Sequence, residues 1–224
     1  CARPSTRCRL QLCEGRRYAA VVLRRLRVAA RYPGVVAVHK WAIVVAGREV
    51  NRALVTSVPS LLSWRRLVAH DLSKLSRAEL MPYAWHFADR DRHEPDPAFE
   101  RAWRHHYEHN DHHPEHFFDE HQTPRRMPDE AVVEMVVDWM AASRAYEGTW
   151  PCCGGHWRWL EHSWDRLKLH PANKALAGAI VCALGYRTAI PEYDWDDARQ
   201  VTDDPAQLDA LRAHAATAPP PRFG

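Results

Sequence analysis

The sequence predicts an all-α protein, built as one bundle of seven or eight helices. Apolar residues recur at three- and four-residue spacing through the longer segments, which is the pattern of amphipathic helices. No segment alternates apolar and polar residues over a length useful for a β-strand, and we find no internal repeat. A chain of 224 residues with 46% hydrophobic residues can form a single domain with an ample core.

Four helices are expected in the first half of the chain. They span 17–31, 35 to about 55, 60–71 and 76 to about 87. The Pro33-Gly34 pair should break the first helix from the second. Ser60 is a candidate N-cap of the third. Ser76 and Glu79 have the spacing of a capping box, which predicts that the fourth helix begins there.

The second half begins with a helix whose start is marked by Asp96 as N-cap and Pro97 at the first helical position. On this helix His106 and His113 continue the apolar face of Phe99 and Trp103, which predicts that both imidazoles point inward. His112 joins them if the helix ends near residue 110. Further helices are expected from residue 128, at about 156–168, at 172–185 and at 205–215.

Histidine is over-represented: the chain has fifteen, and six of them lie between residues 105 and 116. Metal binding explains such an excess, and a tolerated surface run is the alternative. The candidate metal-site residues lie on four predicted helices: His39, His70, Asp71, His106, His112, His113, Glu134 and Asp138. Glu134 and Asp138 are one turn apart, so their charges repel unless a cation lies between them. Imidazole and carboxylate without thiolate suit one or two divalent ions of Mn, Fe, Co, Ni, Zn or Mg, and mixed ligation of this kind is typical of catalytic sites.

The six cysteines form no C-x-x-C pair, which favours a reduced, intracellular and cytoplasmic protein over a disulfide framework. A cluster of Cys152, Cys153, His156 and His162 could hold zinc, although its spacing matches no structural zinc pattern. No apolar run reaches the roughly 18 residues of a membrane span, so no membrane association is expected.

The N-terminal segment is strongly basic, since residues 1–31 contain nine arginines and one acid, Glu14. Such an arm can bind nucleic acid, can be a targeting segment, or can be a solvated helix face. Three regions are therefore expected: a basic arm at 1–33, a helical domain at 34–190 and a polar extension at 191–224. The first residue is Cys, which is compatible with a fragment or a processed product, and the oligomeric state stays open.

The order His39, His70-Asp71, Asp138 resembles that of the HD-domain superfamily of metal-dependent phosphohydrolases. Members of that superfamily are all-α, and they carry His … His-Asp … Asp on successive helices. The resemblance implies that the region 34–190 is an HD-like metal-binding domain in which these four residues bind one ion. A second ion would use Asp71 as a bridge, together with the histidines at 106, 112 and 113.

A narrower resemblance covers about residues 35–186. The stretches HDLSK with Glu79 and Tyr83, AWRHHYEHNDHH and MPDEAVVEMVVDW look like those of a family of unknown function found among bacterial and viral proteins. Pro114 departs from that pattern, where an aromatic residue is expected after the His pair, and it should alter the helix end near His113. Both tails lie outside this resemblance.

The superfamily resemblance implies a phosphohydrolase that acts on a nucleotide or another small phosphorylated substrate through a metal-activated water. Lys74 would neutralise charge on the phosphoryl oxygens, or would only stabilise a helix C-terminus. Glu134 would bind the metal or orient a ligating histidine. Three alternatives remain: a di-iron oxygenase with the same ligands, a non-catalytic binding protein stabilised by metal, and a nucleic-acid-binding protein that uses the arginine arm.

Overall fold

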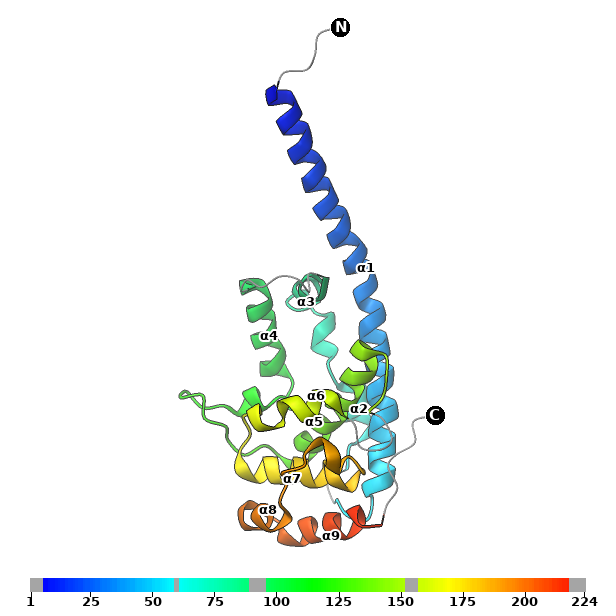
Figure 1. The fold of residues 1–224 in the computed structure, drawn as a ribbon, viewed down its shortest axis with the longest axis vertical. Coiled ribbons are helices and arrows are strands. Elements are labelled where there is room, and N and C mark those ends of the chain that lie inside the picture. Colours follow the sequence, from blue (N-terminus) through cyan, green and yellow to red (C-terminus); the bar gives the residue numbers. More distant parts are fainter. Residues whose placement is uncertain (1–5, 59–60, 89–95, 152–156, 218–224) are drawn as a thin grey trace.

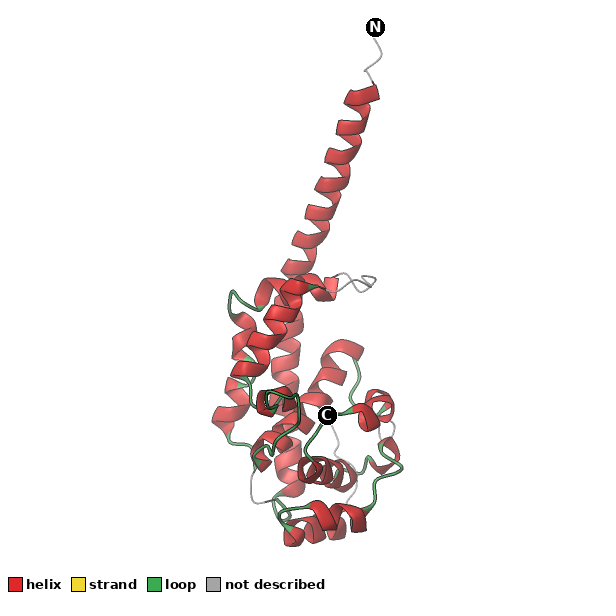
Figure 2. Ribbon diagram, turned by 90° about the vertical axis from the view of Figure 1, so that its left-hand side faces the viewer, coloured by secondary structure: helices red, strands yellow, loops and turns green. Residues whose placement is uncertain are grey.

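The computed structural model describes residues 6–58, 61–88, 96–151 and 157–217, and for residues 6–29 it describes the backbone alone. The all-α prediction is confirmed. These ranges contain nine α-helices rather than seven or eight, and their extended structure is limited to an isolated bridge between Phe118 and Pro124. Figure 1 shows a helical body from which the N-terminal half of the first helix projects, and Figure 2 shows the same projection from the side.

The nine helices are α1 (Thr6–Leu54), α2 (Trp64–Ala69), α3 (Leu80–Ala88), α4 (Pro97–His109), α5 (Asp129–Ala142), α6 (Arg158–Ser163), α7 (Pro171–Ala183), α8 (Trp195–Val201) and α9 (Pro205–Ala215). Short 3-10 turns lie between them: η1 (Leu72–Leu75), η2 (Pro114–Phe117), η4 (Trp164–Arg166) and η5 (Arg187–Ala189). A π-helical turn, η3 (Ser143–Glu147), directly follows α5.

The expected break at Pro33-Gly34 is wrong, because α1 continues through Pro33. A proline inside a helix removes one hydrogen bond and crowds the preceding turn. Packing on both sides of the proline offsets that cost. Tyr32 is buried and Val36 packs against the same small cluster around Tyr83, so the two residues hold one face of α1 against α3.

The main core lies around α5 and α7, whose inward faces are almost wholly buried. α1 packs against α5, and α8 and α9 pack against α7. Helix α8 was not predicted from the sequence, although Asp194 caps it by accepting hydrogen bonds from the N–H groups of Asp196 and Asp197. Residues of the expected polar extension reach this core, since Leu208 and Leu211 are buried in it.

Helix α2 is short and lies close to α1. Gly47 permits this approach, because a Cβ at that position would overlap the Leu67 side chain. Ser63 caps the helix by accepting from the N–H of Arg66 at 3.2 Å, whereas the expected cap, Ser60, lies outside the described residues. The helix ends at Ala69, so His70 and Asp71 lie in the turn that follows.

Two other helix boundaries differ from expectation in ways that matter for the site. α3 begins at Leu80 rather than at Ser76, and Glu79 is fully buried instead of capping a helix. α4 begins as predicted, with Asp96 accepting from two N–H groups, but it ends at His109. His112 and His113 therefore lie in the turn before η2. Among the described residues, no helix is long and apolar enough to cross a membrane.

Candidate metal centre

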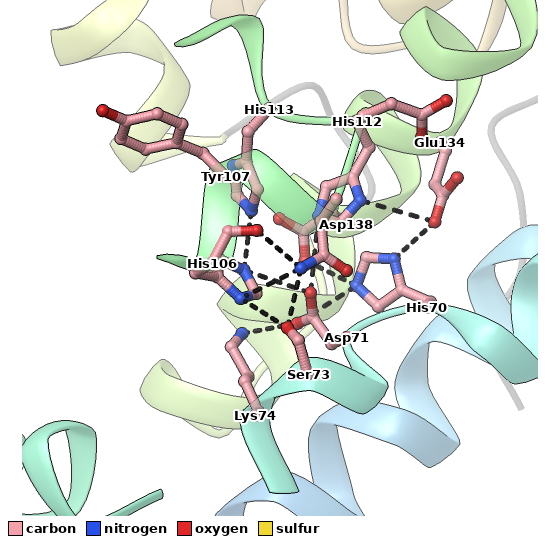
Figure 3. Close-up of polar contacts among 12 residues, drawn as sticks. His70, Asp71, Ser73, Lys74, His106, Tyr107, His112, His113, Glu134 and Asp138 are labelled. Carbon is pink, nitrogen blue, oxygen red and sulfur yellow. Dashed lines mark hydrogen bonds and ion pairs between the residues drawn. The ribbon is translucent and has the colours of Figure 1, made fainter. Parts of the chain in front are cut away.

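The eight predicted site residues converge on one place in the fold. α1 supplies His39, the turn after α2 supplies His70 and Asp71, α4 and its following turn supply the three later histidines, and α5 supplies Glu134 and Asp138. Figure 3 shows side chains from the turn after α2, from α4 and its following turn, and from α5 turned toward one another around Asp71. Six of the eight are buried, and the two that are partly exposed are His113 and Asp138.

The first group comprises His39, His70, Asp71 and Asp138. The Nε2 atoms of His39 and His70 are 3.3 Å apart. Each lies 3.3 Å from Asp71 Oδ2 and 3.1–3.3 Å from Asp138 Oδ1. Donors bonded to one ion at about 2.0–2.1 Å lie roughly 3.0 Å apart in octahedral geometry and roughly 3.4 Å apart in tetrahedral geometry. The observed separations fall within that range.

The second group comprises Asp71, His106, His112 and His113. Asp71 Oδ1 lies 3.2 Å from Nε2 of His106 and 3.5 Å from Nε2 of His112. Nε2 of His113 lies 2.9 Å from Nε2 of His106. Within each group the donor atoms all lie within 4.8 Å of one another, which is close enough to hold a metal ion.

Asp71 belongs to both groups and turns a different oxygen toward each. Oδ2 faces the first group and Oδ1 faces the second. Its backbone is in the left-handed region, with φ at 56°, which is uncommon for a non-glycine residue and is tolerated best by Asp and Asn. This conformation reverses the chain between α2 and η1, so that the side chains of His70 and Asp71 both face the donor atoms of the first group.

Unpartnered buried atoms support the fit of these residues to metal ions. Asp71 Oδ1, His112 Nε2 and Asp138 Oδ1 are buried and have no hydrogen-bond partner among the residues that the structure describes. Such an atom costs roughly 1–3 kcal/mol of folding free energy when nothing compensates it. All three are nitrogen or carboxylate donors that face the interior of the two groups, so a cation in each group would compensate all three.

Metal binding requires neutral imidazole and ionised carboxylate. His112, His113 and the two aspartates meet this condition. Burial alone would lower the pKa values of His70 and His106, but the carboxylate of Asp71 raises them, so that a bound cation would have to displace their protons. Enclosure in the protein lowers the pKa of His113 to about 3 and holds the pKa of His112 well below its usual value, aided by neighbouring histidines. Burial alone would raise the pKa of Asp71, but His70 and Lys74 hold it well below the usual range. The adjacent rings of His39 and His70 likewise hold the pKa of Asp138 well below its usual range, against the effect of burial.

Glu134 lies behind the histidines rather than between the donors of the first group. Its Oε1 is 2.7 Å from Nδ1 of His70 and 3.5 Å from Nδ1 of His112, the ring atoms opposite those that face Asp71. Its other oxygen forms an ion pair with Arg66, which also pairs with Asp111. His70, His112 and Glu134 also form a third group of donors that lie within 4.8 Å of one another. Because these are the ring atoms turned away from Asp71 and Glu134 already pairs with Arg66, the geometry favours, of the two predicted roles, orientation of the histidines.

Glu79 is the carboxylate that contacts the second group from behind, as Glu134 does for the first, and it was not among the site residues predicted from the sequence. Its Oε2 lies 2.8 Å from Nδ1 of His106, and its Oε1 lies 2.7 Å from Nδ1 of His105. Ser73 donates to Glu79 at 3.1 Å, and Asn110 donates to Ser73 at 2.7 Å. These contacts orient His106 so that its Nε2 points at Asp71.

Replacement of Glu79 by glutamine is expected to weaken metal binding in the second group selectively. The amide keeps the shape but loses the charge that fixes the His106 tautomer, and loss of such a partner typically costs 10–100-fold in metal affinity. Metal titration of Glu79→Gln should show one weakened site, and Glu134→Gln should weaken the site that contains His70. Equal affinities in Glu79→Gln and the parent protein would exclude this orienting role.

Lys74 lies beside the shared carboxylate. Its Nζ donates to Asp71 Oδ2 at 2.5 Å and lies 5.8 Å from the centre of the Tyr83 ring. Burial alone would lower the pKa of Lys74, but Asp71 holds it well above the usual value, so the ammonium is charged. The side chain therefore directs positive charge into the cluster.

A cavity of about 600 Å³ opens beside the two groups. His112, His113 and Asp138 form part of its lining, and Tyr146 of the π-helical turn η3 lies on the same wall. Irregular π-helical turns are frequent at functional sites. A small molecule in this cavity would reach donor atoms of both groups.

The second predicted metal cluster is not tested by the structure. Cys152, Cys153 and His156 lie outside the described residues. The remaining member, His162, is exposed on α6, where its ring contacts the carbonyl oxygen of Arg158 at 2.7 Å. The basic arm is described as helical backbone from Thr6, as part of α1.

The fold and the site define a class: an all-α protein with a buried His/Asp/Glu cluster whose donor atoms are close enough to hold metal ions. Residues 29–182 match the family of unknown function DUF5662, and the chain belongs to that family. This span agrees with the predicted resemblance over about residues 35–186. Comparison with curated proteins and with solved structures found no match to either.

Proposed function

We propose that the protein is a metal-dependent phosphohydrolase that acts on a small phosphoester with two divalent ions. One observation carries this proposal: the two donor groups share Asp71 and adjoin a cavity of substrate size. Two ions joined in this way are the usual arrangement for in-line displacement at phosphorus. The order of His39, His70-Asp71 and Asp138 resembles that of HD-domain phosphohydrolases, which supports the same reaction class by analogy.

The residues divide into holding and orienting roles. His39, His70 and Asp138 would hold the first ion, His106, His112 and His113 the second, and Asp71 both. Divalent ions at these positions would acidify bound water and polarise phosphoryl oxygens. Glu79 and Glu134 fix the imidazole rings from behind.

Lys74 would contribute charge and orientation. Its ammonium is held against Asp71, where it can balance negative charge that collects on the phosphoryl group. Tyr146 lines the same cavity as Asp138, so its hydroxyl can contact an oxygen of a substrate bound there.

The proposal is tested with purified protein loaded separately with Mn, Fe, Co, Ni, Zn and Mg and assayed on phosphomonoesters, phosphodiesters and nucleotides. Turnover is expected with at least one metal, and it should fall at least a hundredfold in His70→Ala and Asp138→Ala. His121→Ala is the matched control, because its side chain is 80% exposed and belongs to neither donor group.

Each contrary result identifies a different function. Metal binding without turnover of any ester would contradict a hydrolase and leave a metal-stabilised binding protein. Iron retained on purification, with oxygen consumption that the His70→Ala variant loses, would identify an oxygenase that uses the same ligands.

A further inference from the structure

We propose that the cavity beside the metal groups binds a flat, aromatic part of the substrate, so that the preferred substrates are esters with an aromatic body. This inference rests on the proposed function, because it assigns the group attached to the phosphoester. The cavity volume of about 600 Å³ lies within the usual range for small-molecule sites, and it exceeds what a phosphate group alone would fill.

The cavity is continuous with the metal groups. His112, His113 and Asp138 belong both to the donor groups and to the cavity lining. The ring of Trp103 lies edge-on to the ring of His113, with their centres 4.9 Å apart, and Trp103 also lines the cavity. A molecule that presents an oxygen anion to the metal groups would therefore place its remaining atoms against aromatic side chains.

The walls of this cavity are mainly aromatic and aliphatic. They are formed by Trp103, Phe118, Met135, Trp139, Tyr146, Trp159 and Leu167. The rings of Trp139 and Trp159 have centres 5.6 Å apart and planes inclined at 54°. Together they form an angled surface on which a flat ring can stack with one and meet the edge of the other.

The exposure of these rings indicates that they have surface left to bury. Trp159 is 39% exposed and lies on the short helix α6, opposite Trp139 on α5. Covering apolar surface of this kind is favourable, and stacking of a ring on tryptophan adds to it. A flat apolar ligand would gain both contributions, whereas a polar sugar or glycerol would gain little from either.

The charged residues of the lining do not favour a second anionic group. Arg166 and Lys168 are balanced by Glu115 and Glu147. The strong positive charge would instead lie at the metal groups, next to Lys74. The expected ligand therefore has one anionic end, at the metal groups, and a neutral aromatic body in the cavity.

Calorimetric titration of the metal-loaded protein tests this assignment with two non-hydrolysable probes, 1-naphthylphosphonate and methylphosphonate. The naphthyl probe should bind at least tenfold more tightly, with a more negative heat-capacity change, because it buries apolar surface. Trp159→Ala should lower the affinity for the naphthyl probe about tenfold and leave the affinity for methylphosphonate unchanged. Trp159→Phe should retain part of the affinity.

The matched control is Trp64→Ala, since Trp64 is 62% exposed and does not line the cavity. Its affinity for both probes should equal that of the parent, and retained metal content confirms that each variant is folded. Equal affinities for the two probes, or equal losses in Trp159→Ala and Trp64→Ala, would overturn the assignment. A different result would contradict the hydrolase proposal alone: the naphthyl compounds bind more tightly and depend on Trp159, but neither naphthyl phosphate nor any other ester is hydrolysed.

Discussion

In the metal-loaded protein, replacement of Asp71 by asparagine is expected to abolish binding of both proposed metal ions. Its two oxygens face different donor groups, and asparagine keeps the size of the side chain while removing the charge. Asparagine also tolerates the left-handed backbone at this position, so the turn should persist. We expect bound metal, measured by elemental analysis after gel filtration, to fall to about a tenth of the parent content or less.

Variants that each remove one histidine from a single donor group test whether Asp71 serves both groups. His39→Ala should lose the first ion and His113→Ala the second, so each should retain about one equivalent where the parent retains two. His121→Ala should retain both ions, because its ring is exposed and belongs to neither donor group. Retention of one equivalent by Asp71→Asn would show that the carboxylate is not shared.

Removal of metal is expected to lower the melting temperature by roughly 10–20 °C. An ion that binds only the folded state at one hundred times its dissociation constant adds about 2.7 kcal/mol, and two ions add about twice that. Each kcal/mol shifts the melting temperature of a protein of this size by about 2–4 °C. The unpartnered donor atoms of the cluster give a physical reason, since chelation leaves them buried and uncompensated.

Differential scanning calorimetry with a chelator, followed by addition of metal, measures this effect. Restoration of the original melting temperature by added metal is expected in the parent protein. Asp71→Asn should melt at the same temperature with and without chelator. An equal chelator-dependent shift in the parent and in Asp71→Asn would place the stabilising metal elsewhere in the chain.

Local sequence patterns were sufficient for most of the fold, because helix periodicity and caps act within a few residues. Asp96 before Pro97 marks the start of α4, and 205–215 matches α9. The pattern failed at Pro33, where tertiary packing of Tyr32 and Val36 overrides a local breaker. It also failed at α8, although the Asp194 cap was a usable signal.

The donor residues could be predicted because residue types and their order were informative together. The carboxylates that orient these donors could not be predicted, because the contact between Glu79 and His106, 27 positions later, depends on tertiary structure. The spacing of Ser76 and Glu79 predicted a capping box, but the helix begins only at Leu80, so that prediction is wrong. The position of Arg66 behind Glu134 is likewise visible only when α2 and α5 are placed together.

The central claim, two ions joined by Asp71, is tested most directly by anomalous X-ray diffraction from crystals of the metal-loaded protein. We predict two anomalous peaks within about 4 Å of each other, one on each side of the Asp71 carboxylate. One peak should adjoin His39 and Asp138, and the other His106 and His113. The absence of an anomalous peak at Asp71, or metal bound only elsewhere, would contradict the claim.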